Sequence, residues 1–130
     1  MRRTLFLLSL SLPLLAACAA EDNLAQQPPR VVFFTEDSAA IDPAGRAVVS
    51  EAAALANRNP TVPVLVAGFA DPDGGRAYNR ALSETRAQNV AAALREDGVA
   101  PARIAVSPRG AVPFIAFPVE SRRVEIKVGP

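Results

Sequence analysis

The stretch GFADPDGGRAYNRALSETRA, at residues 68–87, carries the charged residues with the clearest chemical potential in this sequence. Asp71 directly follows an apolar run, and Arg86 comes fifteen positions later. An acid and a base at this separation have three uses: a structural ion pair, part of a surface charge pattern, or two halves of a binding site. Which use applies depends on the elements that position the two side chains.

The elements around this stretch alternate between strands and helices. Apolar runs at 31–34, 61–69 and 103–107 and an alternating run at 122–128 predict four strands. One helix is predicted to start at Pro43, capped by Asp42, and to stop before Pro60. A second follows the DPDGG turn and runs to about Asp97, with Gly98 as its stop. The order β-α-β-α-β-β predicts an α/β (α+β) fold with helices packed on one sheet.

A helical wheel at about 100° per residue places Arg86 on the inward face of the second helix. The core stripe of this wheel consists of Tyr78, Leu82, Val90 and Ala93. Arg86 is therefore not a surface charge, and a buried guanidinium must be paired. Asn79 lies on the same face nearer the helix start, and Asp71 lies in the loop that leads into the helix.

These polar residues converge near the exit of the second strand, where β/α folds usually place ligands. Two interpretations stay open at this point. Either Asp71 and Arg86 bond each other and fix the loop, or together they bind a ligand. The turn does not match a calcium loop, because Gly75, Arg76 and Leu82 stand where that loop needs an Asp or Asn, a Gly and a Glu.

Composition excludes several functional classes. The 130 residues suffice for one domain, half of them are hydrophobic, and the formal net charge is +1. Aromatic content is 5% without tryptophan, which argues against a nucleic-acid surface. There is no histidine and one cysteine, so no ordinary catalytic triad and no intrachain disulfide can form. We expect no enzyme activity, no metal and no cofactor.

The N-terminus has the order of a secretory signal. Arg2 and Arg3 precede an apolar run from Leu5 to Ala17, too short for a span of roughly 20 residues. The sequence Leu-Ala-Ala-Cys at 15–18 resembles the bacterial lipobox, which implies cleavage after residue 17 and acylation of Cys18. Ala19, in place of an aspartate, favours the outer membrane by the sorting rule known for enteric bacteria. Residues 18–30 are interpreted as the lipidated N-terminus and a tether.

The stretch from Gly68 to Val90 resembles the signature of the OmpA-like C-terminal domain, the family that includes the peptidoglycan-associated lipoproteins. That signature is Gly-x-x-Asp-x-x-Gly, then Tyr-Asn-x-x-Leu-Ser, then Arg-Ala-x-x-Val, and the sequence fits it without a gap. The flanking segments at 31–42, 97–110 and 121–128 match the other strands of the family. The resemblance covers residues 31–129 and implies helices packed on one mixed four-stranded sheet.

The resemblance also implies a ligand. The family binds peptidoglycan non-covalently through the side-chain end of meso-diaminopimelate, which carries an ammonium and a carboxylate on one carbon. The resemblance assigns the ammonium to Asp71 and the carboxylate to Arg86. A guanidinium suits a carboxylate because it can form a bidentate hydrogen bond with it. Asn79 and Arg122 stand at polar family positions and are expected to support the site.

These features predict an outer-membrane lipoprotein with a periplasmic domain that links the membrane to the cell wall. The alternative is a protein-interaction module of an envelope complex with weak or no wall binding. The segment at 111–120 is shorter than usual in the family and keeps this alternative open, and Ser121 replaces the usual asparagine. Tol-type or other envelope proteins are the protein partners that the resemblance suggests.

Overall fold

The computed structural model describes residues 23–111, 119 and 121–130. The main elements are β1 (Arg30–Phe33), α1 (Pro43–Arg58), β2 (Val64–Ala70), α2 (Arg76–Glu96), β3 (Ile104–Ala111) and β4 (Arg123–Val128). Two short 3-10 helices, η1 (Leu24–Gln26) and η2 (Pro101–Arg103), precede β1 and β3. The predicted order of strands and helices is confirmed.

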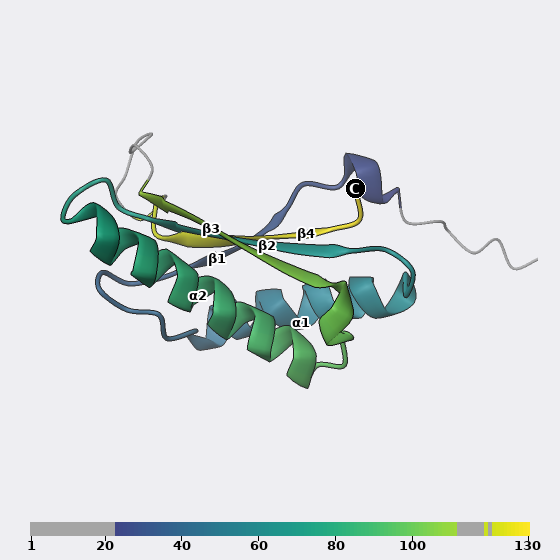
Figure 1. The fold of residues 1–130 in the computed structure, drawn as a ribbon. Helices are drawn as coiled ribbons and strands as arrows, with labels where there is room; N and C mark the ends of the chain where they lie inside the picture. The colour runs from purple at the N-terminus through teal and green to yellow at the C-terminus, as the bar shows by residue number, and fades with distance from the viewer. Residues whose placement is uncertain (1–22, 112–118, 120) are drawn as a thin grey trace, which may run out of the picture.

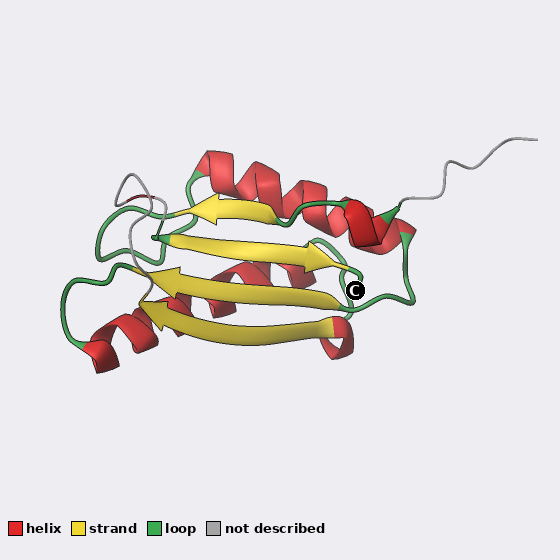
Figure 2. Cartoon of the chain, turned by 90° about the horizontal axis from the view of Figure 1, so that it is seen from above, coloured by secondary structure: helices red, strands yellow, loops and turns green. Residues whose placement is uncertain are grey.

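The four strands form one mixed sheet in the order β1-β4-β2-β3. Strand β4 runs antiparallel to both β1 and β2, whereas β2 and β3 are parallel. Both helices cover the same face of the sheet, as Figures 1 and 2 show from two directions. The carboxyl ends of β1, β2 and β3 therefore lie at one end of the sheet, together with the start of β4 and of α2.

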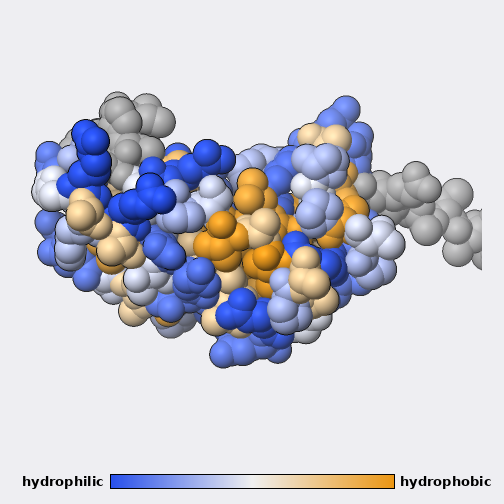
Figure 3. All heavy atoms as spheres, in the orientation of Figure 1, coloured by the Kyte–Doolittle hydropathy of each residue, from blue (hydrophilic) through white to orange (hydrophobic). Residues whose placement is uncertain are grey.

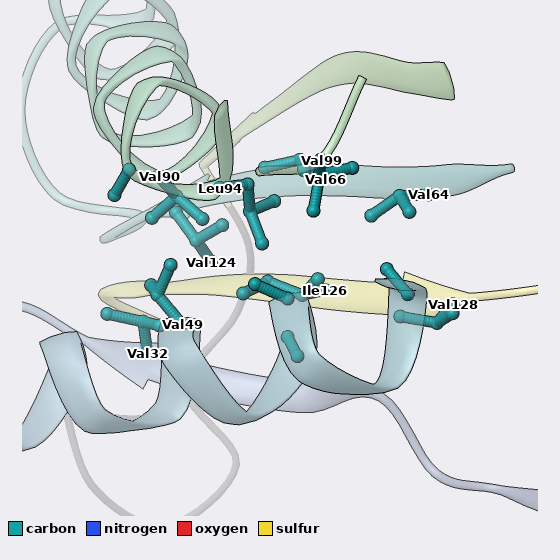
Figure 4. Packing of buried hydrophobic residues seen from close by; sticks show 14 of the residues in the cluster. Val32, Val49, Val64, Val66, Val90, Leu94, Val99, Val124, Ile126 and Val128 are labelled. Atoms are coloured by element: carbon teal, nitrogen blue, oxygen red, sulfur yellow. The ribbon is translucent and has the colours of Figure 1, made fainter. Parts of the chain in front are cut away.

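The hydrophobic core lies between this sheet face and the two helices (Figure 4). It includes Val32, Val64, Val66, Val124, Ile126 and Val128 from the strands and Val49, Leu55, Val90 and Leu94 from the helices. The alternation predicted for β4 is confirmed, because Val124, Ile126 and Val128 are buried and the charged residues between them are only partly so. The core thus fixes the register of the strand that Arg122 directly precedes.

The predicted helix boundaries are also confirmed. The Asp42 carboxylate accepts a hydrogen bond of 2.7 Å from the Gly45 N–H, and Pro43 occupies the first turn of α1. Helix α2 ends at Glu96, and Gly98 follows with a φ of +94°, a backbone conformation that glycine adopts without strain.

Helix α2 lies in backbone contact with β2 at Gly68. A Cβ atom on Gly68 would lie only 2.1 Å from the Ser83 carbonyl oxygen, so no side chain fits between strand and helix there. The Ser83 hydroxyl accepts a hydrogen bond of 3.1 Å from the Gly110 N–H of β3. These contacts hold the turn of α2 that carries Ser83 and Arg86 against the carboxyl ends of β2 and β3.

The packed part of the chain extends further toward the N-terminus than the sequence suggests. We expected a tether up to residue 30, yet Leu24 is 8% exposed and belongs to the core cluster. Gly129 lies against Leu24, and Lys127 Nζ donates to the main-chain oxygens of Leu24 and Gln27 at 3.4 and 2.8 Å. A single leucine outside any periodic pattern gives no sequence signal, so this docking emerges only from the structure.

Candidate functional site

A pocket opens at the end of the sheet where β2 finishes and α2 begins. Its volume is about 220 Å³. It is lined by Glu36, Asp37, Asp71, Asp73, Gly74, Tyr78, Asn79, Leu82, Arg86 and Arg122. Hydrophilic side chains cover most of this end of the molecule in Figure 3. The four residues that the sequence singled out, Asp71, Asn79, Arg86 and Arg122, therefore line one cavity.

Arg86 forms the floor of the pocket. Its side chain is fully buried, as the wheel predicts. The guanidinium donates from Nε to the Ser38 oxygen at 2.8 Å, from Nη2 to the Thr35 oxygen at 3.0 Å and from Nη1 to the Phe69 oxygen at 3.3 Å. Its carbon lies 5.2 Å from the centre of the Phe34 ring. Arg86 thus joins the loop after β1 to the end of β2.

These bonds leave part of the guanidinium available. Arginine has five N–H donors, and three of them point to main-chain oxygens here. One donor remains on each of Nη1 and Nη2. A bidentate hydrogen bond to a carboxylate needs two such donors. Burial lowers the pKa of Arg86, and the Asp71 carboxylate counteracts this shift. A second anion would relieve the cost of burying this charge.

Two residues that directly precede β4 donate hydrogen bonds to the Asp71 carboxylate. Ser121 Oγ donates to Asp71 Oδ1 at 2.6 Å, and Arg122 Nη1 donates to Oδ2 at 3.4 Å. Each carboxylate oxygen therefore has one partner and retains a lone pair. Among the interactions of the described residues, no hydrogen bond or salt bridge joins Asp71 to Arg86. The structure therefore does not show the direct bond between Asp71 and Arg86 that one of the two interpretations requires.

Arg122 connects Asp71 to the loop after β1. Its Nη1 atom lies 3.9 Å from Glu36 Oε2 and 3.4 Å from Asp71 Oδ2. Its Nε atom is buried and has no hydrogen-bond partner in the part of the chain that the structure describes. Arg122 thus lines the pocket beside Asp71, and its charge helps to orient that carboxylate.

Asn79 shapes the loop at the mouth of the pocket. Its side chain is 3% exposed, and Nδ2 donates to the Asp73 oxygen at 2.7 Å. Gly74, the next residue of the loop, has a φ of +93°, which a residue with a side chain rarely adopts. The amide therefore fixes the turn that follows Asp71, which is a supporting position of the kind expected from the sequence.

Tyr78 lies outside the core, contrary to the wheel. It is 52% exposed, and its hydroxyl donates to Asp37 Oδ1 at 2.9 Å. This hydrogen bond raises the pKa of Tyr78. The wheel assigned Tyr78 to the core because a periodic pattern does not show that the first turn of α2 extends past the sheet. The structure assigns it to the rim of the pocket.

The pocket combines both signs of charge. Four carboxylates and two guanidinium groups line it, with Asp71 and Arg86 each retaining hydrogen-bonding capacity. Such a site can hold a small group that carries an ammonium and a carboxylate together. Within residues 23–111, 119 and 121–130, no group of three or more His, Cys, Asp or Glu side chains could hold a metal ion.

Two further predictions fall outside this geometry. Cys18 and most of the short segment at 111–120 lie outside the described residues. Of the helices that the structure describes, none has the length and apolar character to cross a membrane. Five further pocket or site residues were not predicted: Ser121, Tyr78, Glu36, Asp37 and Asp73. Tyr78 has the spacing of a core residue, and the others come from distant segments or from positions without a periodic signal.

Several known proteins are similar to this chain in sequence. The chain is 35% identical over 115 residues to the probable lipoprotein YiaD of Escherichia coli K12, covering 84% of this chain and 52% of that protein. It is 33% identical to outer membrane protein A of Bordetella avium, covering 74% and 53%. The chain thus spans about half the length of these relatives.

Solved structures of other proteins have the same fold. The peptidoglycan-associated lipoprotein from Burkholderia pseudomallei superposes with a TM-score of 0.71 and 27% identity, over 76% of this chain and 89% of that one. The C-terminal domain of Helicobacter pylori MotB shares the fold, with a TM-score of 0.68 and 24% identity over 78% and 84%. The model of the OmpA family matches residues 33–121, which include every residue that lines the pocket except Arg122. The chain belongs to the OmpA family.

Proposed function

We propose that this protein is an outer-membrane lipoprotein that binds peptidoglycan non-covalently and links the membrane to the cell wall. Acylated Cys18 is the membrane anchor, and the domain lies in the periplasm. The ligand is the side-chain end of meso-diaminopimelate in the stem peptide. Asp71 receives its ammonium and Arg86 its carboxylate, with Asn79 and Arg122 in support.

The arrangement of the two charges carries this proposal. Asp71 retains one lone pair on each oxygen, and Arg86 retains two N–H donors. The two groups line the same cavity of about 220 Å³ without bonding each other. A cavity of this size accommodates the end of one amino acid and not a sugar chain. A zwitterion satisfies both charges at once, which neither a simple cation nor a simple anion does.

The relatives support the same function. One relative is named a probable lipoprotein, and one structural neighbour is named a peptidoglycan-associated lipoprotein. The lipobox-like segment at 15–18 is the feature of this sequence that corresponds to the first name. The pocket, with its acid and its buried arginine, corresponds to the second.

Co-sedimentation of the mature chain with purified sacculi tests wall binding. We expect the chain to pellet with sacculi and to be released by free meso-diaminopimelate. Cadaverine (1,5-diaminopentane) is the matched competitor, because it keeps the ammonium groups of diaminopimelate without the neighbouring carboxylates, and we expect it to release far less. Equal release by both compounds would remove Arg86 from the proposed recognition, and absence of pelleting would favour the protein-interaction module.

Mass spectrometry of the membrane-extracted protein tests the anchor. We expect an N-terminal lipopeptide that begins at Cys18. A soluble protein with an unmodified cysteine would contradict the anchor without affecting the binding site. Zymography on cell walls tests the proposal that the protein is not a hydrolase, for which we expect no clearing.

A further inference from the structure

The N-terminal end of the described chain and the pocket lie at opposite ends of the sheet. The described chain begins at residue 23 beside the end of β4, whereas the pocket lies beyond the end of β2 (Figure 1). Gly129 N–H donates to the Pro63 oxygen at 2.9 Å, so the end of β4 lies next to the start of β2. The length of β2, seven residues or roughly 23 Å, therefore separates the two ends.

The docking of η1 makes the connection to the anchor short. Leu24 is buried against Gly129, and Lys127 bonds the main-chain oxygens of Leu24 and Gln27. Arg30 donates to the side chain of Gln27 at 3.4 Å and ties this segment to the start of β1. We call this arrangement, residues 24–27 held by Lys127 and Gly129, the η1 clip.

The clip leaves five residue steps between Cys18 and Asn23. At full extension these steps span roughly 18 Å, which is shorter than the roughly 23 Å along β2 alone. Were residues 18–30 a free tether, twelve steps would reach roughly 43 Å. Turning the pocket toward the membrane would need the longer connection, because the clipped end would then lie farther from the membrane than five residues can reach.

We propose that the η1 clip turns the end of the domain that carries Gly129 toward the lipid surface and points the pocket away from it. The inference rests on the proposed anchor at Cys18 and adds to it an orientation and a limit on reach. The clipped protein holds its ligand within roughly 40 Å of the membrane, plus the length of the pocket loops. A free tether would add roughly 25 Å to this distance.

Tether length, and not charge, sets this orientation. Arg30, Arg103 and Lys127 lie at the anchor end and bond only neutral oxygens within the described residues, so their charges suit a phosphate-bearing surface. However, Glu21 and Asp22 directly precede Asn23 in the sequence and carry two negative charges. The orientation should therefore persist on neutral lipids.

Energy transfer to the membrane tests the orientation. The chain from residue 18 is coupled through Cys18 to a maleimide lipid in phosphatidylcholine vesicles, so the result does not depend on acylation in the cell. A donor dye is attached through an azide-bearing amino acid at exposed Thr61, near the anchor end, or at exposed Ala77, near the pocket. With acceptors on lipid headgroups, we expect stronger transfer from position 61 than from position 77.

Two altered chains identify the cause. The double variant Leu24→Ser and Lys127→Met releases the clip, and Lys127→Met alone weakens it with less risk to folding. A chain with about ten Gly and Ser residues inserted between Asp22 and Asn23 keeps the clip but lengthens the tether. We expect both the double variant and the insertion to lose most of the difference between the two positions, and Lys127→Met to lose part of it.

Equal transfer from both positions in the unaltered chain would overturn the proposal. So would a double variant that melts as a folded domain and keeps the full difference. Co-sedimentation with sacculi, measured on the same chains without vesicles, reports the proposed wall binding separately. Failure of wall binding with intact orientation would thus reject the proposed function and not this inference.

Discussion

Two arginines in this domain make the same kind of contact at opposite ends of the sheet. Arg86 donates to three main-chain oxygens, of Thr35, Ser38 and Phe69. Arg103 also donates to three, of Ala56, Asn59 and Val62, at 2.8 to 2.9 Å. Each therefore joins segments that are distant in sequence, and the hydrogen-bond pattern alone does not tell a binding residue from a structural one.

The surroundings distinguish them. Arg86 is fully buried on the floor of a pocket that also contains Asp71, whereas Arg103 is partly exposed and does not line that pocket. Arg103 donates to carbonyls at and just after the end of α1, a common use of a basic side chain near a helix end. The comparison teaches that cavity and neighbouring charge, and not the number of carbonyls bonded, mark an arginine as a candidate for ligand binding.

Arg86→Ala should have the largest effect, because it removes both functions of this residue. Three main-chain oxygens lose a donor, at a cost of about 1–3 kcal/mol for each that stays buried and unpaired. We expect a clear loss of thermal stability together with loss of sacculus binding by about two orders of magnitude or more. Binding is measured well below the melting temperature of the variant. Normal binding by a folded Arg86→Ala chain would reduce Arg86 to a structural residue.

Asp71→Asn should separate binding from stability. The substitution keeps the size of the side chain, and its one amide oxygen can still accept the 2.6 Å hydrogen bond from Ser121. Only the longer bond of 3.4 Å from Arg122 is lost, so we expect a small change in melting temperature. Loss of the charge should weaken sacculus binding by about one to two orders of magnitude, since a hydrogen bond to a charged group contributes about 1.5–3 kcal/mol. A large drop in melting temperature with unchanged binding would contradict the proposed role.

Arg103→Ala is the matched control for Arg86→Ala. It removes an arginine with the same number of carbonyl contacts, and we expect destabilisation of about 1–3 kcal/mol from the loss of its three hydrogen bonds. Chemical denaturation measures this loss. Sacculus binding should stay unchanged in the folded chain, and a binding defect comparable to that of Arg86→Ala would remove the contrast between the two arginines.

Ser121→Ala should have a smaller effect, exerted through Asp71. Loss of the 2.6 Å hydrogen bond to Oδ1 frees the carboxylate to rotate. This hydrogen bond contacts no ligand atom and Arg122 still bonds the other carboxylate oxygen, so only part of its loss reaches the ligand, and we expect binding to weaken by about two- to tenfold. Ser121→Asn retains a donor and should recover part of the loss. Identical binding by both variants would mean that Ser121 does not position Asp71.

Asp97→Asn should give the smallest effect, a slight loss of stability at neutral pH that disappears at low pH. Hydrogen bonds from Arg46, and then from Ser50, hold the pKa of Asp97 below its usual value of about 3.9. Because the folded-state pKa is lower, the stabilisation is present above the unfolded value and is lost as the pH falls through the folded one. Melting curves between neutral pH and pH ~3 should show less acid destabilisation for Asp97→Asn than for the unaltered chain. Arg46 is an arginine whose carboxylate partner lies within the chain, unlike Arg86.

The sequence predicted well wherever a local period or a local signal decides the structure. The inward position of Arg86 follows from helical spacing, and the caps at Asp42 and Gly98 follow from backbone preferences. The fold order followed from strand and helix patterns that tertiary packing did not overturn. These features depend on residues close together in the chain.

The remaining parts of the site depend on contacts between distant segments. Ser121 reaches Asp71 across fifty positions, and the Tyr78 hydroxyl reaches Asp37 across forty-one. Neither contact has a period, and Tyr78 even has the spacing of a core residue. The docking of Leu24 on Gly129 has the same cause, because only the folded sheet places the two ends of the chain side by side.

The close contact at Gly68 sets the dimensions of the pocket from a position outside it. A methyl group on Gly68 would lie 2.1 Å from the Ser83 oxygen, whereas real contacts of this kind are at least 3.0 Å long. Helix α2 would therefore have to shift away from β2. Arg86 lies one turn further along α2 and would be carried away from Asp71 and from its own carbonyl partners. The absence of a Cβ atom at Gly68 therefore sets the spacing between Asp71 and Arg86.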